Sequence, residues 1–223
     1  MNVRPAFVIG NGESRLSIDL VPLKQIGLTV GCNALFRDFN ADILSCCDQR
    51  MVSEATEVYK NPIYTRPEWN TKTNCTAYPE LPYKGSKRED DPWHWNSGPH
   101  AINIACKSSK AGWMGQRSNL IFLLGFDLLP KGSETVNNVY KGTQNYSERD
   151  AKPVDPKYWY YQLAKLFECN PKCSFVWVVP NSYKTPDAWT HDNLFRESIK
   201  NFQNFIDHCE DKSESLDIFF KTI

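Results

Sequence analysis

Two glycines enclosing an asparagine follow the first apolar segment of the chain. Residues 7–9 are apolar and end at Gly10-Asn11-Gly12, and an amphipathic stretch covers residues 16–26. This order predicts a strand, a tight turn and a first helix. In α/β proteins such a junction brings backbone N–H groups and a helix N-terminus to a phosphate. The glycines would let the backbone approach that ligand closely, and the Asn11 amide could both donate and accept.

Polar residues also follow the other apolar segments that we expect to form strands. The ends of these segments carry amides, carboxylates and a hydroxyl, namely Asn11, Asn33, Asp48, Asp127, Asn181 and Ser182. In open parallel sheets, ligands bind outside the carboxyl ends of the strands. An asparagine amide can pair with base and ribose groups without adding charge beside a phosphate. The set therefore predicts a nucleotide-binding crevice, although asparagine and aspartate also favour turns for conformational reasons alone.

The elements that would position these residues alternate between strands and helices. We expect strands at 6–10, 28–31, 42–47, 118–127 and 174–179, and helices at 50–59, from Ser97 through 106, at 156–168, and from Leu194 to Ile206. This alternation predicts one α/β domain over residues 1–223, Rossmann-like, with a mainly parallel, doubly wound sheet. Residues 60–95 are interpreted as short strands and an irregular insertion. The long polar segment 129–154 is interpreted as a functional lid.

The composition of the chain narrows its possible partners. Lys and Arg total 26 and so do Asp and Glu, so the net charge is zero and binding to a nucleic-acid backbone is disfavoured. The longest apolar runs are too short to span a bilayer, and the chain enters a strand at once, without a secretory signal. The eight cysteines match no paired zinc-ligand pattern. We therefore expect reduced thiols and a cytoplasmic location, and the oligomeric state stays open.

Five short segments of the chain resemble segments of a known protein family, in the same order and at similar spacing. They are GNGESRLS (10–17), VGCNALFRDF (30–39), NSGPHAINIA (96–105), FLLGFDL (122–128) and VVPNS (178–182). These segments resemble the bacterial lipooligosaccharide sialyltransferases, which have a Gly-Asn-Gly-Pro-Ser turn, a Cys-Asn after the second strand and a late Pro-Asn-Ser. The glycine turn is also similar to that of pterin diphosphokinase-like proteins, and the chain resembles proteins of marine bacteriophages.

The resemblance implies transfer of a sugar from a CMP-type nucleotide donor to a hydroxyl-bearing acceptor, with no obligatory metal or other cofactor. The residues that it assigns to the nucleotide are Asn11, Gly12, Asn33, Ser97 and Gly98, with Asn181 and Ser182 closing the base side. It places Asp127 beside the ribose or the sugar. The lid tyrosines of the family correspond best to Tyr140 and Tyr146. Their hydroxyls would donate hydrogen bonds to the departing phosphate and stabilise its developing charge.

Two positions depart from the family pattern. Glu13 stands where the family has proline, and a carboxylate beside a phosphate is unfavourable unless it points away or binds a metal. The family's catalytic histidine lies between the lid and the next helix, where this chain has none. The acceptor hydroxyl would then need Asp150, Asp155 or a histidine from elsewhere as general base. His94 and His100 flank the Asn-Ser-Gly segment and could reach the site.

Two other functions are compatible with the same residues. In an ATP-dependent diphosphokinase-like phosphotransferase, Glu13, Asp48 and Asp127 would bind magnesium. In a catalytically inactive phage-type protein, the fold would serve to bind a nucleotide or a host protein, and the missing histidine favours that interpretation. Fold alone does not distinguish among the three.

Overall fold

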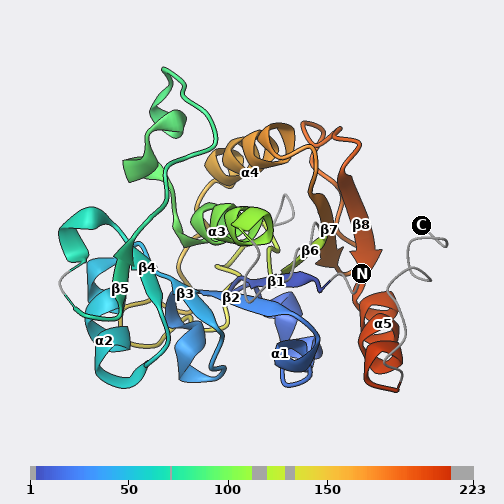
Figure 1. Ribbon diagram of the computed structural model, residues 1–223, viewed down its shortest axis with the longest axis horizontal. Helices are drawn as coiled ribbons and strands as arrows, with labels where there is room; N and C mark the ends of the chain where they lie inside the picture. The colour runs from blue at the N-terminus through green and yellow to red at the C-terminus, as the bar shows by residue number, and fades with distance from the viewer. Residues whose placement is uncertain (1–3, 71, 112–119, 129–133, 212–223) are drawn as a thin grey trace.

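Eight parallel strands form one open sheet in the computed structural model, which describes residues 4–70, 72–111, 120–128 and 134–211 (Figure 1). The strands are β1 (Ala6–Ile9), β2 (Leu28–Cys32), β3 (Ile43–Ser45), β4 (Ile63–Thr65), β5 (Cys75–Ala77), β6 (Leu120–Leu124), β7 (Ser174–Val179) and β8 (Leu194–Ser198). Their order is β5-β4-β3-β2-β1-β6-β7-β8, and every neighbouring pair is parallel. The predicted doubly wound, Rossmann-like α/β fold is confirmed, and the strand order reverses between β1 and β6.

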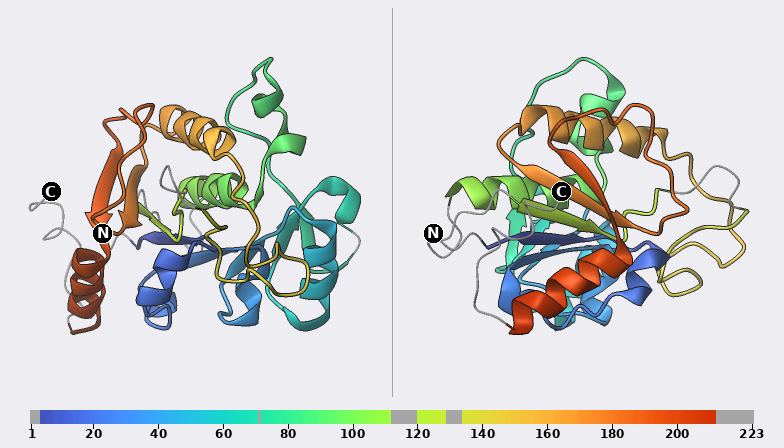
Figure 2. Two further views of the ribbon diagram at one scale, coloured as in Figure 1. Left: turned by 180° about the vertical axis from the view of Figure 1, so that it is seen from behind. Right: turned by 90° about the vertical axis from the view of Figure 1, so that its right-hand side faces the viewer.

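Helices cover both faces of this sheet. They are α1 (Leu23–Ile26), α2 (Gln49–Val58), α3 (Ser97–Ala111), α4 (Lys157–Cys169) and α5 (Ile199–Asp211). Helices α1, α2 and α5 lie on one face, and α3 and α4 lie on the other (Figures 1 and 2). A hydrophobic core lies on each face of the sheet. Because side chains alternate along a strand, Phe7 and Ile9 of β1 pack into one core, and Ala6 and Val8 pack into the other. Burial on both faces explains why the strands are almost continuously apolar.

The segment after β1 differs from the predicted amphipathic helix. It forms a short 3₁₀ helix, η1 (Glu13–Ser17), followed by the single turn of α1. Pro22 divides the segment, since proline disfavours helical backbone in the residue before it and lacks an N–H of its own. Leu16, expected on the buried face, is 66% exposed.

The C-terminal helix begins later than predicted. Leu194 belongs to β8, which pairs with β7 in the register Phe175↔Leu194, and the helix starts at Ile199. Phe195 lies four residues before Ile199, at helical spacing, so the apolar pattern alone does not mark where the helix begins. The outer edge of β7 needs hydrogen-bond partners for its backbone, and this requirement outweighs the local pattern.

The segment 60–95 is only partly an insertion. Its first half supplies β4 and β5, which extend the sheet, with the 3₁₀ helix η3 (Pro67–Trp69) between them. Its second half contains η4 (Arg88–Asp90) and η5 (Pro92–His94) and rises on the side of α3 and α4 (Figure 1).

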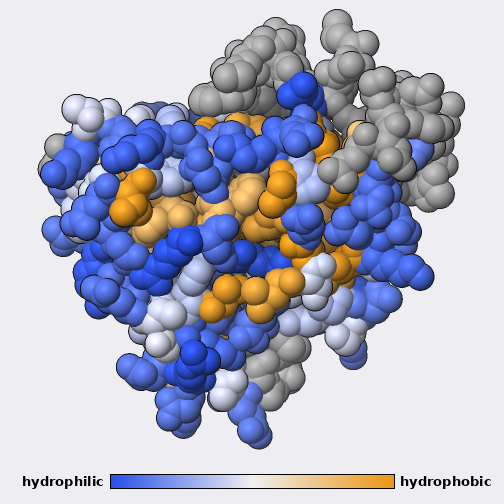
Figure 3. Space-filling model, turned by 90° about the horizontal axis from the view of Figure 1, so that it is seen from below, coloured by the Kyte–Doolittle hydropathy of each residue, from blue (hydrophilic) through white to orange (hydrophobic). Residues whose placement is uncertain are grey.

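The outer surface offers no membrane-spanning element within the described ranges. None of the helices there is long and apolar enough to cross a bilayer. Viewed from the side of α1, α2 and α5, a band of apolar residues crosses a surface that is otherwise polar (Figure 3).

Candidate functional site

The turns that end β1 and β6 meet at the point where the strand order reverses. The amide of Gly10 donates to the carbonyl of Leu124 (2.8 Å), and the amide of Gly12 donates to that of Gly125 (2.9 Å). A Cβ on Gly10 would lie 2.6 Å from the Gly125 oxygen, and Gly125 itself has a φ of +66°. The glycines therefore allow two backbones to approach each other where parallel sheets bind ligands.

The glycine turn does not present an open phosphate cradle, which corrects the sequence-based expectation. The Asp127 carboxylate accepts hydrogen bonds from the Ser14 amide (2.8 Å) and the Ser14 hydroxyl. The Glu13 amide donates to Asn137 Oδ1 at 2.7 Å. The amides at the start of η1 are thus used by the protein's own oxygens. Gly12 is needed because a Cβ there would lie 2.4 Å from the Asp127 carboxyl carbon.

A cavity of about 230 Å³ opens beside these turns. It is smaller than the ~300–1,000 Å³ of pockets that enclose drug-sized ligands, so it can enclose only part of a nucleotide sugar. Half of the predicted site residues line it, namely Gly10, Asn11, Gly12, Asn33, Ser97, Gly98 and Asp127. They come from four separate segments of the chain, so the prediction that the strand ends converge is met for this group.

Asn11 is held in one orientation at the cavity wall. Its Nδ2 donates to the carbonyl of Cys32 (3.1 Å) and to the hydroxyl oxygen of Tyr146 (3.0 Å). Because a carbonyl can only accept, the first bond fixes which end of the amide is nitrogen. Asn11 Oδ1 is then left buried and without a partner among the described residues. A buried acceptor without a partner is costly, so this atom is suited to a donor group on a ligand.

Tyr146 has hydrogen-bonding capacity to spare. Its hydroxyl accepts from Asn11 and from the Ala34 amide (3.4 Å), and no acceptor within the described part of the chain takes its proton. Burial raises the pKa of this phenol, so it stays protonated at neutral pH. Tyr146 is not itself a lining residue of the cavity. It lies directly behind Asn11.

A second network joins Asn33 to the start of α3. The Ser97 hydroxyl donates to Asn33 Oδ1 (2.5 Å) and accepts from the Cys47 amide (3.0 Å). Asn33 has a φ of +47°, a left-handed conformation that asparagine tolerates better than most residues. The helix cap is Asn96 and not Ser97, since Asn96 Oδ1 accepts from the Gly98 amide at 3.2 Å.

Asp127 is the acidic side chain on the described wall of the cavity. Burial raises the pKa of its carboxyl, and the Ser14 hydrogen bonds act in the opposite direction. A carboxylate with a raised pKa is a stronger base than one in water. Cys32 also lines the cavity, and burial raises the pKa of its thiol, which keeps it protonated.

Tyr140 does not have the free hydroxyl that its predicted role requires. It donates to Asp38 Oδ1 (2.6 Å) and accepts from Arg15 Nη2 (2.7 Å). The ring is buried and is not among the residues that line the cavity. Within the chain, Tyr140 orders the buried Arg15 and does not present a donor to a ligand.

His100 is a core residue and not a candidate base. Its ring stacks on Tyr78 with centroids 3.7 Å apart and an interplanar angle of 3°, and it packs against Trp95. Burial lowers the pKa of the imidazole to about 3, so it is neutral at pH 7. The sequence-based expectation that it could reach the cavity is wrong, because His100 is buried against Tyr78 and Trp95 and does not line the cavity.

Four other predicted site residues lie outside the cavity lining. Asp48 caps α2 by accepting from the Arg50 amide (2.9 Å). Asp150, Asn181 and Ser182 are exposed and line no part of it. Glu13, Asp48 and Asp127, the magnesium ligands of the diphosphokinase alternative, do not form a three-carboxylate cluster. Across the described ranges no three His, Cys, Asp or Glu side chains gather closely enough to hold a metal ion.

The described part of the lid, residues 134–154, closes one side of the cavity, and residues 129–133 lie outside the described ranges. The Val139 amide donates to the Asn11 carbonyl (2.8 Å), and Lys141 forms an ion pair with Glu13 (2.7 Å). That pair explains how a carboxylate is tolerated where the family has proline. Asn137 and Asn138 line the cavity; the sequence predicted a lid here but singled out neither of these asparagines as a site residue.

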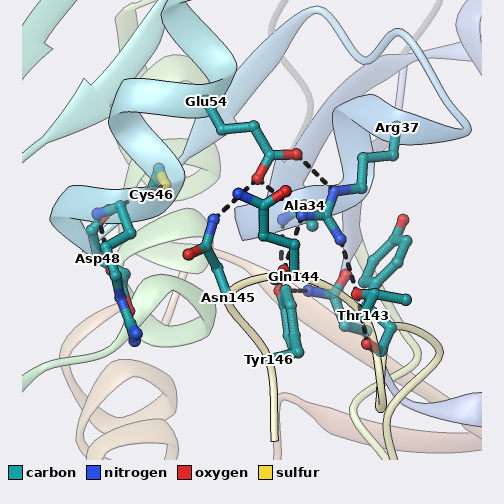
Figure 4. Close-up of polar contacts among 12 residues, drawn as sticks. Ala34, Arg37, Cys46, Asp48, Glu54, Thr143, Gln144, Asn145 and Tyr146 are labelled. Atoms are coloured by element: carbon teal, nitrogen blue, oxygen red, sulfur yellow. Dashed lines mark hydrogen bonds and ion pairs between the residues drawn. The ribbon is translucent and has the colours of Figure 1, made fainter.

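The chain matches no family model, no curated protein and no solved structure. The function must therefore be argued from the cavity and its lid. Residues 143 and 145 of the lid form hydrogen bonds to Arg37 and Glu54, which do not line the cavity (Figure 4). The resulting site is a crevice rich in amide groups, with one buried carboxylate and a tyrosine hydroxyl behind its wall.

Proposed function

We propose that the crevice binds a nucleotide-sugar donor of the CMP type and that the protein transfers its sugar to a hydroxyl acceptor. The proposal rests on one observation: two neighbouring groups have unused hydrogen-bonding capacity. Asn11 Oδ1 is an acceptor without a donor, and the Tyr146 hydroxyl is a donor without an acceptor among the described residues. They stand at the sheet position where α/β proteins bind nucleotides. The resemblance to the sialyltransferases supplies the choice of CMP and of sugar transfer.

Each residue has a role that follows from its hydrogen bonds. The cavity receives the nucleoside, with Asn11 and Asn33 facing its polar edges. The phosphate extends beyond the cavity toward Tyr146, whose proton stabilises the charge on the departing CMP. This assigns the leaving-group role to Tyr146 alone, since the proton of Tyr140 is used by Asp38.

Asp127 is the general base of this proposal. It lines the cavity, its raised pKa favours proton uptake, and it is fixed by Ser14. The carboxylate takes the proton of the acceptor hydroxyl as that oxygen bonds to the anomeric carbon and the bond to the CMP phosphate breaks. It replaces the histidine that the family uses elsewhere. We place the reaction in the cytoplasm, where the buried thiols of Cys32 and Cys46 would stay reduced.

A binding protein without turnover is the second candidate. It is favoured by the burial of His100 in an aromatic stack, which removes this predicted base from catalysis. Such a protein would bind the same nucleotides through Asn11 and Tyr146 but would leave the donor intact.

Thermal denaturation with added nucleotides tests the proposal. At a ligand concentration a hundred times Kd, binding stabilises by about 2.7 kcal/mol, which raises Tm by about 5–10 °C for a chain of this length. We expect CMP to do so with or without EDTA. Tyr146→Phe should weaken the shift, whereas Tyr64→Phe, which removes a hydroxyl from β4 and leaves the Asn11–Tyr146 bond intact, should not. Absence of any shift with CMP, UMP or AMP would refute nucleotide binding.

Release of CMP from CMP-sugars, measured with wild type and Asp127→Asn, separates the two candidates. Release that is lost in the variant while CMP still binds supports transfer with Asp127 as base. Binding of CMP-sugar without release from the wild type, with a panel of sugar acceptors present, selects the binding protein. A shift that needs ATP and magnesium would favour the diphosphokinase alternative instead.

A further inference from the structure

An ion pair outside the cavity forms hydrogen bonds to three residues of the lid. Arg37, the last residue of the 3₁₀ helix η2 (Asn33–Arg37), meets Glu54 of α2 through two parallel bonds, Nε to Oε1 and Nη2 to Oε2, both 2.7 Å. Both side chains are partly buried, at 21% and 29% exposure. Such a two-bond arginine–carboxylate contact fixes the planes of both groups relative to each other. We call these two residues the latch pair.

The latch pair also bonds three consecutive lid residues (Figure 4). Arg37 Nη1 donates to the Thr143 hydroxyl (2.8 Å), and Nη2 donates to the Gln144 carbonyl (2.9 Å). Glu54 Oε2 accepts from Asn145 Nδ2 at 3.1 Å. Asn145 has a φ of +65°, a conformation that costs energy and persists only where its surroundings hold it. The latch pair supplies that hold.

The residue after this gripped segment is Tyr146. Its hydroxyl meets Asn11 and the Ala34 amide, and the Arg37 guanidinium lies 5.8 Å from its ring centroid. We propose that Arg37 and Glu54 are positioning residues that hold the Tyr146 hydroxyl against Asn11. The consequence for ligand binding rests on the proposed function, whereas the positioning itself does not.

The first part of the lid has anchors of its own. Asn137 accepts from the Glu13 amide (2.7 Å), Lys141 pairs with Glu13 (2.7 Å), and the Val139 amide donates to the Asn11 carbonyl (2.8 Å). Loss of the latch pair should therefore release residues 143–146 and leave residues 136–141 in place. A contact that merely stabilised the fold would not produce this local difference.

Hydrogen exchange measures that difference without any ligand. The Thr143 amide donates to the Tyr140 carbonyl and the Tyr146 amide to the Thr143 carbonyl, each at 3.1 Å. In Arg37→Met and Glu54→Gln we expect both amides to exchange about tenfold faster or more, with the Val139 amide unchanged. Glu168→Gln breaks an ion pair of equal length, Lys165–Glu168 at 2.7 Å, and serves as the control.

The geometry of the arginine is tested by Arg37→Lys. Lysine keeps the charge but cannot bond Glu54, Thr143 and Gln144 together from one planar group. We expect fast exchange at Tyr146 in this variant as well. Full protection in Arg37→Lys, or equal acceleration at Val139 and Tyr146 in Arg37→Met, would overturn the positioning role.

Titration with CMP then connects positioning to the site. We expect Arg37→Met to weaken CMP binding about as much as Tyr146→Phe, by about tenfold to a hundredfold for one lost hydrogen bond to a charged group. The double variant should bind no more weakly than Tyr146→Phe alone. Additive losses would show that Arg37 acts elsewhere. If wild type binds no CMP, the proposed function fails, and the exchange data still decide the role of the latch pair.

Discussion

Replacing Gly12 by alanine tests whether this glycine exists to accommodate the protein's own carboxylate. The new Cβ would lie 2.4 Å from Asp127 Cγ and 2.6 and 2.7 Å from its oxygens. Gly12 has an ordinary extended backbone, with φ −64° and ψ 146°, so alanine is not strained by its own conformation. The whole penalty must come from the clash with Asp127, which Ser14 prevents from moving freely.

The magnitude follows from three contributions. Overpacking a filled site costs about 1–3 kcal/mol, and displacing a carboxylate from its donors costs about 1.5–3 kcal/mol. The lower chain entropy of unfolded alanine returns about 0.4–1 kcal/mol. We therefore expect Gly12→Ala to lower the free energy of unfolding by about 2–5 kcal/mol, and to lower Tm by about 2–4 °C for each kcal/mol.

Urea denaturation followed by circular dichroism measures this change. The control is Gly98→Ala, whose Cβ would lie 3.1 Å from the ring edge of Phe126 and 3.5 Å from Asn96 Oδ1, and should cost about 1 kcal/mol or less. In an Asp127→Ala background, where the carboxyl group is gone, Gly12→Ala should cost little. A loss in that background as large as in the wild type, or a loss below about 1 kcal/mol in the wild type, would refute the steric explanation.

Three further changes have expected outcomes. Tyr140→Phe removes the hydroxyl that bonds both the buried Arg15 and Asp38, and leaves Arg15 with its ion pair to Asp38 alone, so calorimetry should give a loss of about 1–3 kcal/mol, and a loss no larger than that of Tyr64→Phe would contradict this. His100 has a folded pKa of about 3, below its unfolded value, so wild-type stability should fall as pH drops from about 6.5 toward 3, by up to ~1.4 kcal/mol per pH unit. His100→Phe should flatten that slope in acid denaturation, and an unchanged slope would contradict the pKa. Asp48→Ala should cost about 1 kcal/mol by removing the cap of α2, and the CMP-induced shift should stay unchanged.

The fold could be predicted because its information is local. Runs such as residues 120–124 and 175–179 are apolar throughout, as strands buried on both faces must be, and Gly125 and Pro180 follow where they end. Asn11, Asn33 and Asp127 each follow an apolar run of this kind, at the carboxyl ends of β1, β2 and β6. Half of the predicted site residues could therefore be placed from the positions of the apolar runs. No such local signal distinguishes β8 from the helix that follows it, because its partner is β7.

The partners of polar side chains could not be predicted in the same way. Tyr140 and Tyr146 are six residues apart in one loop, yet Asp38 takes the proton of the first and leaves the second unused. His100 was predicted as a possible base from its place in the sequence, but in the structure its ring stacks on Tyr78. Each outcome depends on residues distant in sequence, and a single side chain carries no pattern from which such a partner can be inferred.

The strand order also sets the sequence of events during synthesis. Strands β1 to β5 are neighbours in the sheet in the order in which they are made, so this half can pair as residues 6–77 leave the ribosome. The other edge of β1 stays unpaired until residue 121 is available for residue 6. The crevice lies on the seam between the two halves, so it forms only when the late half joins the early one. A ligand bound there would hold the two halves together, and its binding would report that the chain has finished folding.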